Sequence, residues 1–148
     1  MIIGLTHLHS ALRWVALILL VITVIGAFTG SGSFTEGARK RGLFTMIALH
    51  VQLVVGLALY FLGQNGVALF KQPDVMSNPA LRFFAVEHLT GMLVAIVFAT
   101  LGHSLAKRAT TDQSKYRKQQ IWFTFALILI VASIPWPFRP GFEAYGWF

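Results

Sequence analysis

The chain has 148 residues, of which 56% are hydrophobic and only 11% are charged, and its mean hydropathy is +0.70. This charge content is less than half of that in soluble globular domains, which excludes a soluble enzyme and leaves little room for a second domain. Four stretches without any Lys, Arg, Asp or Glu are each long enough for one helical crossing of a bilayer: residues 14–35, 42–70, 88–106 and 119–138. The sequence predicts a single all-α transmembrane domain over residues 1–148.

The basic residues indicate membrane topology rather than nucleic-acid binding. The formal net charge is +7, but eight of the twelve Lys and Arg residues lie in two short connections: Arg39, Lys40, Arg41, Lys107, Arg108, Lys115, Arg117 and Lys118. Because positive charge is retained on the cytoplasmic side, we expect both connections in the cytoplasm, and both termini and the loop over residues 64–79 outside. The absence of cysteine excludes disulfides and thiolate metal sites.

The first predicted crossing covers residues 5–29 and ends in a Gly-Ser run over residues 30–33, which cannot continue a helix cheaply. No positive charge precedes its apolar run, since Arg13 is the first basic residue, so we interpret it as a retained span rather than a secretory signal. The second predicted crossing covers residues 42–63.

Asn78 and Pro79 are typical of a helix N-cap followed by a first-turn proline, which predicts a third crossing over residues 81–106. The fourth is predicted over residues 119–134. Two prolines stop it, and because they lack a backbone donor they free carbonyls near the outer surface. The aromatic residues that follow are typical of an interfacial anchor: Trp136, Phe138, Phe142, Tyr145, Trp147 and Phe148.

The short connections favour an up-down-up-down four-helix bundle in which the first and third crossings lie diagonally opposite. Polar residues inside the spans are costly unless they are partnered, so their depth is informative. At 1.5 Å per residue, His9 lies about 12 Å, Glu87 about 8 Å, His88 about 7 Å and Arg13 about 6 Å outward of the midplane, and His50 about 4 Å inward.

His9 and His88 therefore share the outer leaflet, on helices separated by a diagonal of roughly 13 Å. A flat cofactor held between two imidazoles suits that gap, and histidine is a common axial ligand of haem, so we expect haem b with His9 and His88 as ligands. Small residues follow His88 on one face of the third crossing: Gly91, Ala95, Ala99 and Gly102. Close helix packing explains this stripe equally well.

Several alternatives stay open at this point. A bare metal ion is less favoured, because Glu87 is the only carboxylate nearby. Arg13 either neutralises haem propionates or pairs with Glu87. His50 either bonds a carbonyl of a neighbouring helix, binds a second cofactor, or replaces His9 as the partner of His88.

The remaining polar residues have ordinary explanations. His7 and His103 lie near bundle ends, and we expect them to face solvent or headgroups. Gln52 and Tyr60 are compatible with a quinone pocket, but such residues are common in transmembrane helices and we expect them to serve packing.

Four segments together resemble a family of small four-span bacterial membrane proteins labelled cytochrome b-like: residues 8–14, 48–57, 82–88 and 134–139. The resemblance covers nearly the whole chain, with one motif in each span. It implies that His9, Arg13, His50, Glu87 and His88 occupy the family's motif positions. His103 falls where relatives more often have arginine, which weakens its case as a ligand.

The sequence thus predicts a b-type cytochrome of the bacterial cytoplasmic membrane. It would pass single electrons between a quinol pool or a respiratory membrane partner and an acceptor on the outer side. Two axial imidazoles leave no open iron position, so neither an oxygenase nor a hydrolase is expected. The alternative is a cofactor-free accessory or assembly subunit with a buried Arg, Glu and His network, and a weaker third is transient metal or haem handling. The oligomeric state, including a homo-oligomer, is left open.

Overall fold

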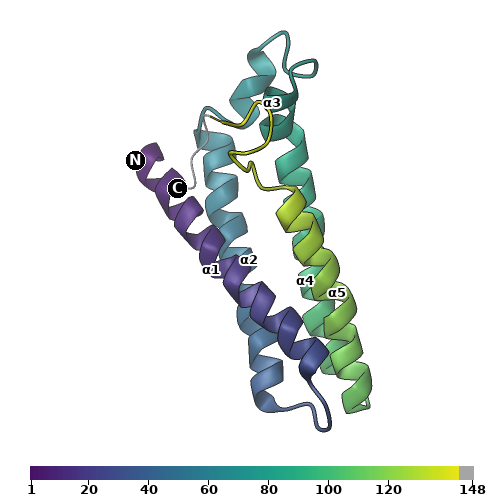
Figure 1. Ribbon diagram of the computed structural model, residues 1–148. Helices are drawn as coiled ribbons and strands as arrows, with labels where there is room; N and C mark the ends of the chain where they lie inside the picture. The colour runs from purple at the N-terminus through teal and green to yellow at the C-terminus, as the bar shows by residue number, and fades with distance from the viewer. Residues whose placement is uncertain (144–148) are drawn as a thin grey trace.

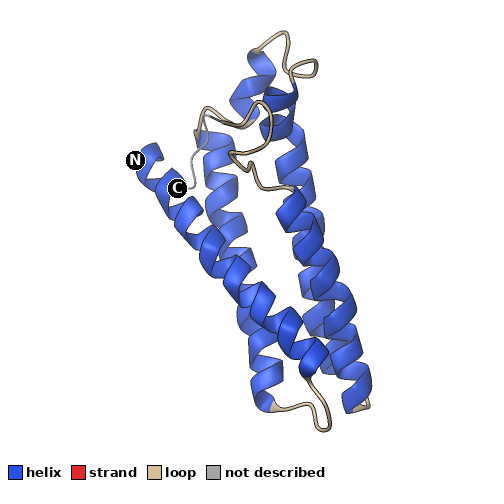
Figure 2. Ribbon diagram, in the orientation of Figure 1, coloured by secondary structure: helices blue, strands red, loops and turns tan. Residues whose placement is uncertain are grey.

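The computed structural model describes residues 1–143, and these residues form helices and loops without any strand (Figure 2). Four long helices build the fold: α1 (Ile2–Thr29), α2 (Glu36–Leu62), α4 (His88–Arg108) and α5 (Asp112–Ala132). Three short elements join α2 to α4: the 3₁₀ turn η1 (Val67–Lys71), α3 (Pro79–Arg82) and the π-helical turn η2 (Phe83–Glu87). The predicted all-α class is confirmed over this part of the chain.

The long helices run antiparallel, in the order predicted (Figure 1). α1 packs against α2 and α5, and α4 packs against the same two helices, so α1 and α4 face each other across the diagonal. The start of α1 and the end of α5 lie at the same end of the bundle (Figure 1). The short connections after α1 and α4 lie at the other end. Which end faces the cytoplasm stays a prediction.

Three segments of the described chain are long and apolar enough to cross a membrane: Ile2–Thr29, Glu36–Lys71 and Pro79–Arg108. This is consistent with a multi-pass membrane protein. The uncharged part of α5 begins at Gln119, and the helix ends at Ala132. That part rises about 20 Å, against about 30 Å of hydrocarbon, so α5 is not counted with the other three and its crossing stays a prediction.

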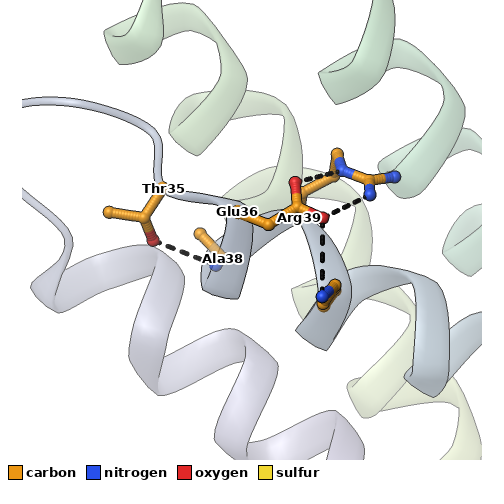
Figure 3. A network of polar contacts seen from close by, with 5 residues as sticks. Thr35, Glu36, Ala38 and Arg39 are labelled. Atoms are coloured by element: carbon orange, nitrogen blue, oxygen red, sulfur yellow. Dashed lines mark hydrogen bonds and ion pairs between the residues drawn. The ribbon is translucent and has the colours of Figure 1, made fainter.

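Two helices begin earlier than expected, because capping residues start them outside the apolar stretch. α2 begins at Glu36 rather than residue 42, since the Thr35 side chain accepts a hydrogen bond from the Ala38 amide at 3.1 Å (Figure 3). Within that first turn Arg39 forms an ion pair with Glu36. Likewise α5 begins directly after the N-cap Thr111 rather than at residue 119.

The predicted N-cap at Asn78 is confirmed. Its Oδ1 accepts hydrogen bonds from the amides of Ala80 at 3.0 Å and Leu81 at 3.3 Å. The helix that follows is not regular, however, because the π-helical turn η2 separates α3 from α4. The His88 amide consequently bonds to the carbonyl of Phe83 rather than to the residue four positions back.

An apolar core fills the bundle between the four long helices. Leu20, Ala99 and Phe123 are completely buried in it, and each comes from a different helix. The opposite faces of the helices are apolar as well: Ile18, Val54, Val97 and Phe125 are at least half exposed. A bundle that is apolar outside as well as inside is what a lipid environment requires.

The fully buried ring of Phe123 gives a test of this core. We expect Phe123→Ala to lower the free energy of unfolding by about 3 kcal/mol, because it removes a ring that touches several helices. Phe125→Ala on the same helix is the matched control, since its ring is half exposed, and it should change stability by less than about 0.5 kcal/mol. Thermal unfolding of the two variants in detergent compares them, and equal losses would contradict the assigned inner face of α5.

Candidate functional site

The imidazoles of His9 and His88 meet between α1 and α4. Their ring centroids lie 6.3 Å apart, and the ring planes make an angle of 74°. Since α1 and α4 are diagonal partners, the two side chains bridge the interior of the bundle. The structure therefore brings together the two histidines that the sequence placed in the same leaflet.

His88 is oriented by a backbone carbonyl of α5. Its Nδ1 lies 2.6 Å from the carbonyl oxygen of Ser133. A carbonyl oxygen can only accept, so Nδ1 carries the hydrogen and the lone pair of the neutral imidazole is on Nε2. This carbonyl is available because α5 ends at Ala132 and because Pro137, four residues further on, has no amide hydrogen.

Close packing of α4 on α5 makes that hydrogen bond possible. A Cβ atom at Gly91 would overlap the Oγ of Ser133, so the absence of a side chain at Gly91 favours this close approach of the helices. Further along the same face Ala95 and Ala99 are completely buried. The stripe of small residues thus serves helix packing, one of the two interpretations that the sequence left open.

The π-helical turn before His88 is anchored from α2. The Tyr60 hydroxyl donates a hydrogen bond of 2.8 Å to the carbonyl of Ala85, in the middle of η2. A π turn disturbs the regular pattern of helical hydrogen bonds, and the phenol stabilises one of its carbonyls. Tyr60 therefore serves packing, as expected.

His9 lies against α2. The Gln52 side chain donates a hydrogen bond of 2.8 Å to the carbonyl of His9. A Cβ atom at Gly56 would come within 3.0 Å of Cε1 of the His9 ring, so a side chain at this position would press against the ring. The Nδ1 atom of His9 is buried and has no hydrogen-bond partner among residues 1–143. A buried imidazole nitrogen without a partner is costly, which makes His9 the incompletely satisfied member of the pair.

Aromatic rings surround the pair at this end of the bundle. The Phe83 ring lies 5.8 Å from the His88 ring. Trp14 of α1 and Trp136 after α5 meet edge to face, with ring centroids 6.2 Å apart. The Arg13 guanidinium, one turn from His9, lies 5.2 Å from the ring of Trp14. A cation and several rings therefore line the surroundings of the two imidazoles.

Two other predicted site residues are not brought to this pair. His50 is exposed, and its Nδ1 lies 2.8 Å from the carbonyl of Met46 one turn back on α2. Glu87 is also exposed, and its carboxylate pairs with Arg82 at 2.7 Å. Glu87 was predicted in the same leaflet as the pair and His50 inward of the midplane, but both side chains leave their helices on the outer face. The structure gives neither residue a part in the site.

The two remaining histidines, His7 and His103, differ in their exposure. His7 is exposed, as expected. The expectation for His103 is wrong, since only 9% of this residue is exposed. The last turns of α4 are covered by neighbouring helices, and the Gln119 side chain of α5 reaches the carbonyl of Ala38 on α2 at 3.2 Å across the same end of the bundle.

Two donors on opposite helices suit a metal held between two imidazoles, but they do not form a complete site for a bare ion. Within residues 1–143 no group of three or more His, Cys, Asp or Glu side chains converges. Metal–imidazole nitrogen distances are about 2 Å, so two imidazoles on opposite sides of one metal have ring centroids roughly 6 Å apart. The observed 6.3 Å agrees with that value.

Comparison of the chain with protein-family models, with curated proteins and with solved structures finds no match.

Two residues of the site were missed by the sequence analysis. Ser133 acts through its carbonyl, and the only sequence indication was Pro137, which removes the amide that would otherwise bond there. Gly56 acts by having no side chain, so it looks like any other glycine of an apolar span.

Substitution of Gly56 tests the placement of His9. We expect Gly56→Leu to displace the His9 ring, because the new side chain would occupy its position, and to change the nitrogen chemical shifts of His9 in NMR spectra of the labelled protein. The shifts of the exposed His50 should stay unchanged. Gly4→Leu is the control, since nothing lies within 4 Å of a Cβ atom at that position. An unchanged His9 signal would contradict its contact with α2.

Proposed function

We propose that the protein is a b-type cytochrome of the membrane, with haem b held between His9 and His88. One observation carries the proposal: imidazoles from two diagonally opposite helices meet inside the bundle with ring centroids 6.3 Å apart. Two imidazoles that would hold one iron between them are expected at about this separation. Histidine pairs on facing helices are the usual way in which helical bundles bind such cofactors.

The residues around the pair support this assignment. The Ser133 carbonyl holds His88 in the tautomer whose Nε2 is free to bind a metal, and ligating histidines commonly have such a partner on their other nitrogen. The absence of a side chain at Gly56 leaves room for the His9 ring. The buried Nδ1 of His9 without a partner among the described residues marks a group that a ligand would help to satisfy.

When bound, haem would supply one-electron chemistry, and His9 and His88 would be the residues that hold it. The chain's own residues would orient the ligands, exclude water and set the potential through burial and charge. The function is therefore electron transfer between a quinol pool or another membrane component and an acceptor on the outer side. As the family resemblance implies, the location is the bacterial cytoplasmic membrane, with α5 as the fourth crossing.

The alternative is a cofactor-free accessory subunit that a buried polar network holds in shape. The bonds from His88 to Ser133 and from Gln52 to His9 favour it, because they join helices without any ligand. The network expected from the sequence included Glu87, but its carboxylate pairs with Arg82 on the surface instead.

A reduced-minus-oxidised absorption spectrum of membranes that contain the overexpressed protein separates the two functions. We expect a low-spin haem b spectrum with one haem per chain. His88→Ala should abolish it, and His9→Ala should abolish or strongly alter it, because each removes one of the two imidazoles that would hold the haem.

His50→Ala and His103→Ala are the matched controls, since both replace a histidine outside the pair, and both variants should keep the spectrum. A colourless wild-type protein with bound-haem content near zero contradicts the proposal and favours the accessory subunit. Loss of the signal in His50→Ala with retention in His9→Ala would instead reassign the ligands.

Arg13 gives a test that depends on charge rather than ligation. Ferric haem carries one more positive charge than ferrous haem, so loss of a nearby cation stabilises the ferric form. Arg13→Ala should therefore lower the reduction potential by roughly 70 mV, as expected for one charge about 10 Å away at an effective dielectric constant of 20. Redox titration measures it. Arg82→Ala is the control, because its guanidinium lies outside the site, in an exposed ion pair with Glu87, and equal shifts in the two variants would count against Arg13.

A further inference from the structure

A cleft of about 190 Å³ lies beside the short connections after α1 and α4, at the end of the bundle away from the His9–His88 pair. Its walls come from three parts of the fold: the start of α2 with the loop before it, the last turn of α4 and the first turn of α5. Three cations line it, Arg39, Lys107 and Lys115, against one carboxylate, that of Glu36. The cleft therefore carries an excess of positive charge contributed by three separate elements.

Two of these cations are held in place by carboxylates on their own helices. Nε and Nη2 of Arg39 donate to the Glu36 carboxylate at 2.8 and 2.6 Å, which leaves Nη1 for another acceptor (Figure 3). Nζ of Lys115 donates to Asp112 at 2.9 Å. This hydrogen bond lowers the pKa of the Asp112 carboxyl, so the pair stays charged at neutral pH. Side chains fixed in this way lose less entropy when they bind an anion.

Lys107 differs from the other two. No ion pair to a carboxylate involves it within residues 1–143, and its side chain is exposed at the mouth of the cleft. The protein therefore compensates the charge of Lys107 less than that of the other two cations, and Lys107 is the one best placed to bind an external anion.

The level of the cleft is that of the lipid headgroups. Lys107 follows directly on the uncharged stretch 88–106, and Arg39 precedes the uncharged stretch 42–70 by one turn. Basic side chains at the ends of apolar spans lie where the hydrocarbon gives way to the headgroup phosphates. Phe34 and Ala106 complete the lining with apolar surface on which a glycerol backbone can rest.

We propose that this cleft binds the phosphate of one anionic phospholipid. The phosphate oxygens accept hydrogen bonds from Lys107, from the free Nη1 of Arg39 and from Lys115, and the acyl chains continue along the apolar helices. Basic pockets between transmembrane helices are known to hold anionic headgroups in this way. A free phosphate ion has the same binding chemistry, so the experiment has to distinguish the two sources.

The test is native mass spectrometry of the full-length protein released from detergent, titrated with dioleoyl phosphatidylglycerol or dioleoyl phosphatidylcholine. We expect one phosphatidylglycerol to bind, and Lys107→Gln to weaken that binding about fivefold, as expected for the loss of one cation at the membrane surface. Lys107→Gln with Lys115→Gln should weaken it about 25-fold. Arg108→Gln is the matched control, because it removes the same charge from the neighbouring residue, which does not line the cleft.

Equal losses in Lys107→Gln and Arg108→Gln, or equal affinity for the zwitterionic lipid, would overturn the proposal. So would displacement of the lipid by an equal concentration of inorganic phosphate, since the site would then recognise the ion and not the lipid. Thermal unfolding without added lipid should be unchanged in Lys107→Gln, because its side chain is exposed and loses no ion pair to any residue of the described range 1–143. None of these results depends on haem.

Discussion

An imidazole buried in an apolar bundle has to place its N–H on an acceptor, and the position of that acceptor determines the geometry of the candidate site. His88 finds it in the Ser133 carbonyl, 2.6 Å away. The carbonyl is free because Pro137 cannot donate to it, and it is within reach because Gly91 lets α5 approach α4. Three features of sequence that look unrelated, a histidine, a glycine and a proline, therefore act on one hydrogen bond. With that nitrogen occupied, the other is left for a ligand.

The two ends of the bundle differ in the side chains that fill their interior. Toward the short connections the helices are joined by aliphatic packing and by buried hydrogen bonds such as that between Thr23 and Thr45, at 2.8 Å. Toward the other end α1 diverges from α5 (Figure 1), and histidine, tryptophan and phenylalanine rings take the place of aliphatic side chains. The end with the short connections thus holds the helices together, and the other end contains the two imidazoles of the candidate site.

Much of the fold follows from uncharged stretches and basic connections, because the bilayer constrains length and charge so strongly. The meeting of His9 with His88 also follows from depth and helix order. Depth does not say which way a side chain points around its helix, however. For this reason Glu87 was assigned to the site, and His50 was kept as a reserve ligand, although both are exposed. The helix starts at Glu36 and Asp112 were missed because caps act outside the apolar stretch. Gly56 could not be recognised, since its role is to have no side chain.

The π-helical turn at Phe83–Glu87 has a consequence for the numbering of related chains. Such a turn accommodates one residue more than an α-helical turn, so everything after it is rotated by about 100° from a regular continuation of α3. The phase of α4, including the direction of His88, is thus set by one inserted residue. A homologous chain without it would need its histidine one position earlier to face the same interior, and an alignment free of gaps would then pair the wrong residues.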